Sequence, residues 1–124
     1  MHFYSQLFSG RIRVSIGLLF SLFILQGICN AEVNGERLFL ENCAECHQGD
    51  GEGIPNIYPS LADSELVLGS GADVALVLII GRGEMPSFNG VFSDEEMAYV
   101  VNYIRSVFSN IDKPISAQTI SLLR

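Results

Sequence analysis

The sequence predicts an all-α domain of four or five short helices that are joined by long loops. The strongest evidence is the stretch 97–108, in which apolar residues recur at three- and four-residue steps, the pattern of an amphipathic helix. The stretches 49–59 and 81–90 are rich in glycine and proline and predict loops. Because a chain of 124 residues with so many loop positions has a thin core, we expect a further component to fill its centre.

The N-terminal segment up to Ala31 is predicted to be an export signal and not part of this domain. Arg11 and Arg13 supply a positive end, an apolar run follows over 14–28, and the segment closes with small residues. A helix that spans a bilayer needs about 20 apolar residues, and this run is shorter. We therefore expect cleavage after Ala31 and a periplasmic domain of residues 32–124, with a retained N-terminal anchor as the alternative.

The charge of the chain argues against two classes of partner. The formal net charge is −7 at pH 7, and two of the seven basic residues lie in the predicted signal, so the domain itself is more acidic. A face that binds nucleic acid needs basic residues to neutralise phosphates, and anionic head groups attract basic segments in the same way. We expect no nucleic-acid partner, and membrane contact only if the N-terminal segment is retained.

Two short helices are predicted in the first half of the domain. The first covers 35–46, with Asn34 as its N-cap and Glu36 in its first turn. The second covers 63–68 and is ended by Gly69. The loop 49–59 would separate these two helices.

The stretch 73–80 permits two interpretations. Its valine, leucine and isoleucine residues favour a strand. Asp73 as a cap and Gly81 as a stop favour a helix instead. The pattern alone leaves both structures open.

The longest helix is predicted to begin at Ser93. Ser93 and Glu96 have the spacing of a capping box, in which each side chain bonds the other residue's backbone N–H. Pro114 ends any continuation, and 116–123 is predicted as a last short helix. The apolar stripe behind the capping box consists of Met97, Val100, Val101, Ile104, Val107 and Phe108.

The segment Cys43-Ala44-Glu45-Cys46-His47 has the spacing C-x-x-C-H, the signature of covalent c-type haem attachment. On a helix, positions i, i+3 and i+4 lie on one face. Two thiols placed in this way can form thioethers with the two vinyl groups at one edge of a porphyrin, while the imidazole reaches the iron.

Three other uses of these cysteines fit the sequence less well. A thioredoxin-like redox pair needs a βαβ context, and no clear strand precedes Cys43. A zinc site needs four ligands, and residues 32–124 contain no Cys or His outside the motif. A structural disulfide across two residues would be strained.

The second axial ligand of the iron is predicted to be Met85. Haem iron in electron carriers commonly takes Met or His at this position, and His2 belongs to the predicted signal. Met97 falls on the apolar stripe and is expected to pack in the core. Met85 lies in the loop 81–90, where Pro86 restricts the backbone and a thioether can reach an open ring face.

Taken together, these features resemble the class I cytochromes c: a first helix that ends in C-x-x-C-H, a Met-Pro loop and a capped closing helix. The likeness covers residues 35–108. It implies the cytochrome c fold around one covalent haem, in which the carbonyl of Pro59 accepts a hydrogen bond from His47 and Leu61 packs on the ring. A chain without haem would then have an apolar cavity flanked by Cys46, His47, Leu61 and Met85.

The resemblance also implies a close contact between the first and the closing helix. Gly35 and Phe39 match one side of this contact, and Val100 and Tyr103 match the other. Such a contact would fix the helix that carries the haem motif.

Within this class, the stretches 51–55, 58–62 and 115–124 are similar to haem domains and subunits of periplasmic quinoprotein dehydrogenases. Because a six-coordinate haem has no vacant position for a substrate, we expect a one-electron carrier and not an enzyme. It would pass electrons from a dehydrogenase or quinol-oxidising complex to a terminal oxidase or reductase. The alternatives are a haem enzyme or gas-binding protein with an open or labile distal site, and a tethered cytochrome subunit of a dehydrogenase complex.

Overall fold

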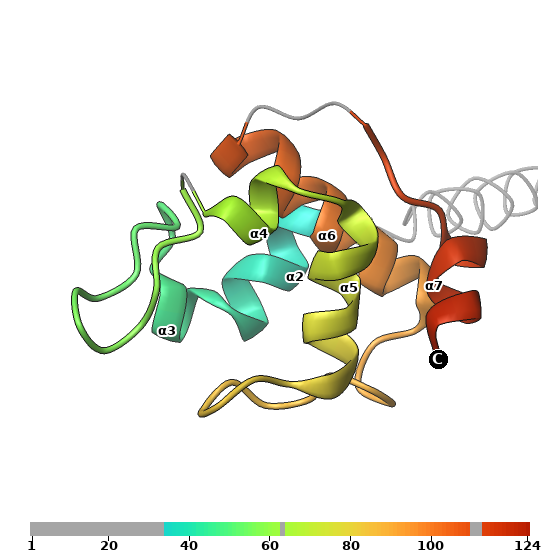
Figure 1. The fold of residues 1–124 in the computed structure, drawn as a ribbon, viewed down its shortest axis with the longest axis horizontal. Coiled ribbons are helices and arrows are strands. Elements are labelled where there is room, and N and C mark those ends of the chain that lie inside the picture. Colours follow the sequence, from blue (N-terminus) through green and yellow to red (C-terminus); the bar gives the residue numbers. More distant parts are fainter. Residues whose placement is uncertain (1–33, 63, 110–112) are drawn as a thin grey trace, which may run out of the picture. The chain divides into compact units, whose positions relative to one another are not determined.

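The computed structural model describes residues 34–62, 64–109 and 113–124, all of which belong to the unit Glu32–Arg124. These residues form helices and loops with only isolated β-bridges, so the predicted all-α class is confirmed. None of the described helices has the length and apolar character needed to cross a membrane. The predicted signal and its cleavage site lie outside the described residues. The helices are α2 (Gly35–Asn42), α3 (Ala44–His47), α4 (Glu65–Leu68), α5 (Gly71–Ile80), α6 (Asp94–Ser109) and α7 (Ala117–Leu123) (Figure 1).

The single helix predicted over 35–46 is wrong in one respect, because the structure divides it at Cys43. Asn34 is the N-cap, as predicted, and its side-chain oxygen accepts a hydrogen bond from the Arg37 N–H at 2.8 Å. At Cys43 the backbone leaves the helical region (φ −121°, ψ −31°), which ends α2. The N–H groups of Cys46 and His47 still bond the Cys43 carbonyl, at 3.2 and 2.9 Å. The two cysteines and the histidine therefore keep the one-turn relation that the motif requires.

The middle of the chain forms the helices α4 and α5. The short helix α4 ends at Gly69, as predicted, while Asp63 lies outside the described residues. The ambiguous stretch is helical, and Gly81 ends it. Its N-cap is Ser70 and not Asp73, because the Asp73 N–H donates to the Ser70 hydroxyl at 3.1 Å. Asp73 instead occupies the first turn, where a negative charge favours the helix dipole.

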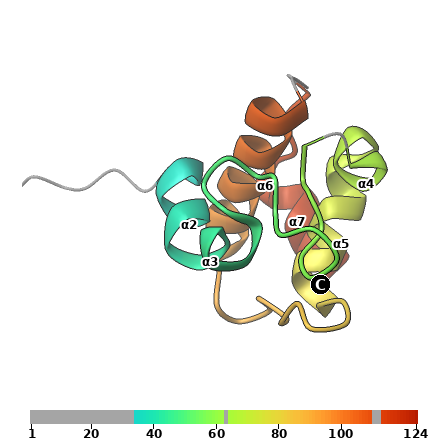
Figure 2. The same ribbon diagram turned by 90° about the vertical axis from the view of Figure 1, so that its left-hand side faces the viewer.

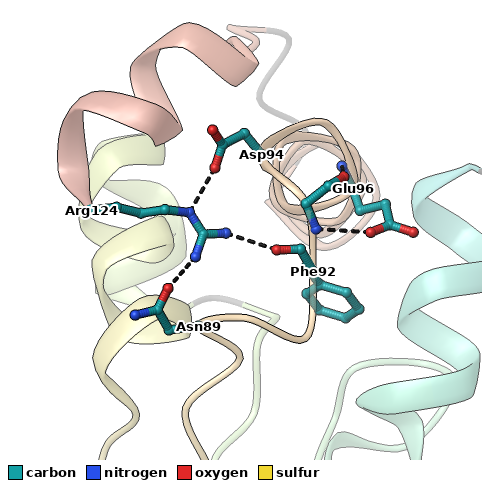
Figure 3. A network of polar contacts seen from close by, with 6 residues as sticks. Asn89, Phe92, Asp94, Glu96 and Arg124 are labelled. Atoms are coloured by element: carbon teal, nitrogen blue, oxygen red, sulfur yellow. Dashed lines mark hydrogen bonds and ion pairs between the residues drawn. The ribbon is translucent and has the colours of Figure 1, made fainter.

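The N-terminus of α6 has the predicted capping box. The Ser93 N–H donates to the Glu96 carboxylate at 2.8 Å, and the Glu96 N–H donates to the Ser93 hydroxyl at 3.2 Å. Figure 3 shows Glu96 turned back toward the start of the helix. The apolar stripe is buried at Met97, Val100, Val101 and Ile104, so the core role predicted for Met97 is confirmed.

The predicted apolar stripe is wrong at Val107, which is not buried. Val107 is 54% exposed, because it lies in the last turn of α6, on the side away from the core. Phe108 continues the stripe instead, half-buried, with its ring centroid 5.1 Å from that of Phe39. The core therefore ends on an aromatic contact with α2.

The helices α2 and α6 pack against each other and approach very closely at Gly35 (Figures 1 and 2). A Cβ atom added to Gly35 would overlap the Tyr99 carbonyl oxygen and lie 2.5 Å from the Tyr103 Cβ. One turn later, Phe39 is fully buried, with its ring centroid 5.6 Å from that of Tyr103. The expected contact between the two helices is confirmed for Tyr103, and the carbonyl of Phe39, whose ring packs there, accepts a hydrogen bond from the Cys43 N–H at 2.8 Å.

The predicted C-terminal helix is present as α7, capped by Ser116, whose hydroxyl accepts from the Thr119 N–H at 3.2 Å. The helix packs on α6 and α5, and Ile120 is its fully buried anchor. The Ile115 backbone, just before it, exchanges two hydrogen bonds with the Asn102 side chain on α6, at 2.8 and 3.0 Å.

A buried arginine joins three segments at the far end of α6. Arg105 is 4% exposed, and its guanidinium donates to the carbonyls of Val67 (3.4 Å), Gly69 (2.8 Å) and Lys113 (2.8 Å). Among the described residues no carboxylate pairs with it. Arg105 thus satisfies carbonyls at the end of α4 and in the segment before α7, which have no helical partner.

Candidate cofactor site

An apolar cleft lies between the helices and two loops. It contains about 400 Å³ of space that no protein atom fills, part of it open to solvent. Apart from one imidazole, a thiol and a thioether, its walls are aliphatic. Such a cleft suits a large apolar ring that offers a metal to nitrogen or sulfur donors. It is lined by Cys43, His47, Leu61, Leu66, Val67, Val74, Val77, Leu78, Met85 and Ile104.

The orientation of His47 is set by a backbone carbonyl. His47 is 8% exposed, and its Nδ1 lies 3.0 Å from the carbonyl oxygen of Pro59, the partner that the resemblance implied. A carbonyl only accepts hydrogen bonds, so Nδ1 carries the proton and donates it. The lone pair of a neutral imidazole is then on Nε2, which leaves this nitrogen free to bind a metal.

The loop between α3 and α4 holds this carbonyl in place, and Figure 2 looks onto the loop with α2 and α3 on one side of it and α4 and α5 on the other. The Gly53 N–H donates to the His47 carbonyl at 2.9 Å, and this hydrogen bond holds the loop against the end of α3. Gly53 has φ +67°, and an added Cβ would lie 2.5 Å from the Tyr58 oxygen and 2.6 Å from the Pro59 oxygen. Only glycine allows both this backbone conformation and this close approach.

Leu61 reaches the cleft because the same loop closes a second time. The Leu61 N–H donates to the Gly51 carbonyl at 2.7 Å, and the Ser60 hydroxyl donates to the same carbonyl at 3.3 Å. The sequence analysis related the stretch 51–55 to known haem domains and named Pro59 and Leu61, but it gave Gly51 and Gly53 no role in the site. The available signal was the alternation Gly49-Asp-Gly-Glu-Gly, since glycine at every second position is typical of a backbone that folds tightly on itself.

The two cysteines differ in their surroundings, and no disulfide joins them. Burial raises the pKa of the Cys43 thiol to about 11, and the negative charge of Cys46 adds to the shift. Cys43 lines the cleft, whereas Cys46 is half-buried and lies beside Tyr58, whose pKa its charge raises. The expected cavity lining is therefore corrected: Cys43 takes the place of Cys46, because Cys43 is buried at the C-cap of α2 whereas Cys46 is only half-buried.

Met85 reaches the cleft from the loop that follows α5, where it is half-buried. Its backbone exchanges two hydrogen bonds with Arg82, both 3.0 Å long, which close a tight turn. Beyond this turn the Ser87 hydroxyl donates to the Ile79 carbonyl at 2.5 Å, and the Phe88 N–H donates to the Leu78 carbonyl at 2.8 Å. The turn with the thioether is thus tied to the end of α5 on both sides.

The structure therefore brings together five of the six predicted site residues or their acceptor groups: Cys43, His47, the Pro59 carbonyl, Leu61 and Met85. Cys46 lies one turn from Cys43, at the edge of this group. Within the described residues no group of three or more His, Cys, Asp or Glu side chains could hold a metal ion. The donors that the cleft offers are an imidazole nitrogen and a thioether sulfur, the pair found on the iron of many c-type haems.

Comparison with known proteins adds independent evidence. The chain matches the family model described as cytochrome C oxidase, cbb3-type, subunit III, over residues 30–104, a range that includes every predicted site residue. It is 31% identical over 126 aligned positions to cytochrome c-552 of Thermus thermophilus, covering 86% of this chain and 84% of that protein.

Two further relatives are a dehydrogenase subunit and a second small cytochrome. The cytochrome c subunit of the alcohol dehydrogenase (quinone) of Gluconobacter oxydans is 33% identical over 104 positions, which cover 73% of this chain and 22% of that subunit. Cytochrome c6 of Bumilleriopsis filiformis is 36% identical over 75 positions, 59% of this chain and 87% of that protein.

Proposed function

Because this chain belongs to the cytochrome c family, in the group described as cytochrome C oxidase, cbb3-type, subunit III, we propose specific roles for its site residues. Cys43 and Cys46 would hold the haem through thioethers, and His47 and Met85 would supply the imidazole nitrogen and the thioether sulfur that bind its iron. The family relationship itself establishes the cytochrome c fold, one covalently bound c-type haem and the role of an electron carrier.

The bond between His47 and the Pro59 carbonyl carries this proposal, since it leaves Nε2 as the free nitrogen inside an apolar cleft that also contains a thioether. When bound, the haem supplies an iron that changes its charge by one electron. The Pro59 carbonyl makes the imidazole of His47 more basic and fixes its orientation. The soft sulfur of Met85 favours the reduced state, as do the aliphatic walls, which disfavour an additional positive charge.

The matched pair Met85 and Met97 tests the axial ligand. The holoprotein, produced in a host competent in cytochrome assembly, should give a pyridine haemochrome spectrum and, when oxidised, the weak far-red band of a sulfur-ligated haem. We expect Met85→Ala to lose this band and to bind cyanide or carbon monoxide rapidly. Met97→Leu should keep the band, because Met97 is buried in the core and Leu conserves its volume.

The same experiment separates the electron carrier from a haem enzyme or gas-binding protein. If the wild-type protein binds cyanide and carbon monoxide as fast as Met85→Ala does, the distal position is open and the assignment of Met85 is wrong. If the wild-type protein gives no haemochrome spectrum at all, attachment through the two cysteines is wrong.

We further propose that the carrier works outside the cytoplasm, with a dehydrogenase or quinol-oxidising complex as donor and an oxidase or reductase as acceptor. The apolar run at 14–28, which lies outside the described residues, supports export. The similarity to the cytochrome c subunit of an alcohol dehydrogenase (quinone) supports a dehydrogenase as donor, and also the alternative of a cytochrome subunit that a retained N-terminal segment tethers. N-terminal sequencing of the mature protein distinguishes the two, since a start at Glu32 indicates a released carrier.

The acidic character of the domain supports docking on basic partner surfaces. Opposite charges steer two proteins together, and salt screens this attraction over about 8–10 Å at physiological ionic strength. We expect the second-order rate of electron transfer to the native partner to fall as salt is added. A rate that is independent of salt would show that the charge serves only solubility.

A further inference from the structure

Arg124 contacts three residues of the stretch 89–94, which is distant from it in sequence. Its Nε donates to the Asp94 carboxylate at 2.6 Å, and its Nη2 donates to the Phe92 carbonyl at 2.8 Å. Its Nη1 donates to the side-chain oxygen of Asn89. Figure 3 shows the guanidinium between these groups, with one N–H directed at each of them. We call this set of contacts the Arg124 clamp.

The Arg124 clamp is less exposed to water than an ordinary surface ion pair. The side chains of Arg124 and Asp94 are only 22% and 30% exposed, so water screens their attraction less than it would at an open surface. Arg124 lies at the C-terminal end of α7 and Asp94 in the first turn of α6, where each charge also interacts favourably with a helix dipole. The fully buried Ile120 anchors α7 in the core, and Arg124 follows directly at the end of this helix.

Two of the three contacts lie on the segment that carries the proposed sulfur ligand. We define the distal loop as residues 81–92, which connect α5 to α6 and include Met85. The rings of Phe88 and Phe92, both in this loop, stack with centroids 5.2 Å apart, and both are buried. The N–H of Phe92 donates to the Phe88 carbonyl at 3.2 Å, which joins the two residues a second time. Arg124 contacts this end of the loop at Asn89 and Phe92.

We propose that Arg124 is a positioning residue for Met85. It keeps the distal loop closed and so disfavours the state in which the Met85 sulfur has left the iron. The inference rests on the proposed axial role of Met85. It predicts that the clamp affects exchange at the distal position more strongly than it affects the stability of the fold.

Imidazole binding to the oxidised holoprotein measures this exchange, because imidazole can bind only where Met85 has left. We expect Arg124→Gln to raise the affinity for imidazole about tenfold, the factor that corresponds to about 1.4 kcal/mol. Arg124→Lys should lie between this variant and the wild type, since an ammonium group lacks the planar fork that serves three acceptors. The far-red band should weaken in the same order.

The control is Ser93→Ala, which removes a capping bond at the same end of α6 but leaves the three acceptors of Arg124 in place. Loss of a cap of this kind destabilises a helix by about 1 kcal/mol. We expect this variant to unfold at a lower temperature than the wild type and to bind imidazole with an affinity within twofold of it.

Two results would overturn the inference. If Arg124→Gln and Ser93→Ala raise imidazole affinity equally, Arg124 merely stabilises the start of α6. If Arg124→Gln binds imidazole as the wild type does, the clamp does not act on Met85. A failure of the proposed function has a different signature: the wild type itself would bind imidazole as tightly as Met85→Ala, whatever the residue at 124.

Discussion

Replacing Gly35 by alanine tests whether the crossing of α2 and α6 depends on the missing side chain. The backbone of Gly35 is helical, so alanine adopts its conformation without strain, and the effect must come from space alone. The added Cβ would overlap the Tyr99 carbonyl oxygen and lie 2.8 Å from the Tyr99 carbonyl carbon. Because these atoms belong to the backbone of α6, no side-chain rotation relieves the overlap, and α2 has to move.

The expected loss of stability follows from two opposing terms. Adding a methyl group to a packed contact costs about 1–3 kcal/mol. Alanine in place of glycine reduces the entropy of the unfolded chain, which returns about 0.4–1 kcal/mol. We therefore expect the free energy of unfolding to fall by roughly 1–2 kcal/mol, and the melting temperature to fall by roughly 4–16 °C in a domain of this size.

Urea and thermal unfolding of the holoprotein, followed by circular dichroism, measure this loss. The matched control is Gly49→Ala, since a Cβ at Gly49 meets only the Leu40 Cδ2, at an ordinary 3.8 Å. That variant should be as stable as the wild type or slightly more stable. If Gly35→Ala has the same midpoint as Gly49→Ala, the two helices can separate at no cost, and the argument from close approach is refuted.

Three further variants test the buried arginine, the loop that holds the Pro59 carbonyl, and the haem-attachment motif. Arg105→Met should lower the free energy of unfolding by about 3 kcal/mol, because it leaves three carbonyls without their donor. Gly53→Ala should displace the Pro59 carbonyl, weaken its bond to the imidazole and so raise the midpoint reduction potential in a spectroelectrochemical titration. Cys43→Ala combined with Cys46→Ala should fail to accumulate as a folded domain, because the cofactor supplies much of a small core.

Each of these variants has an outcome that contradicts the reasoning. Arg37→Met, which breaks a half-exposed ion pair with Glu41 at 3.5 Å, should cost under about 0.5 kcal/mol, and an equal loss in Arg105→Met would show that burial is irrelevant there. A reduction potential in Gly53→Ala equal to that of the wild type would show that the Pro59 carbonyl keeps its place when residue 53 has a side chain. A compact, helical and colourless double cysteine variant would show that the fold needs no haem.

The sequence was most informative where one local rule determines the structure. The caps at Asn34 and Ser93 follow from side chains that satisfy N–H groups within three residues. The burial of Met97 follows from helical periodicity. The C-x-x-C-H motif is similarly local, which explains why its chemistry could be inferred without coordinates.

The sequence was least informative where distant segments decide the outcome. The strand-or-helix ambiguity of 73–80 concerned a stretch that is apolar on nearly all sides, and its burial among α4, α6 and α7 removes the periodicity that separates the two structures. Arg105 is on no recognisable motif, because its three acceptors come from segments up to 38 residues away. The Arg124 clamp has the same character, with partners 30 to 35 residues distant.

The acceptor that aims His47 is part of the main chain, and this gives the site an unusual tolerance. A carbonyl is present whatever the side chain at 59, so point mutations at that position cannot delete the acceptor itself. The vulnerable element is the route of the chain, which two hydrogen-bonded closures and the close packing of Gly53 determine. Random mutagenesis should therefore find sensitive positions at Gly51 and Gly53. Permissive positions should be those with exposed side chains in the same loop, such as Glu52 and Ile57.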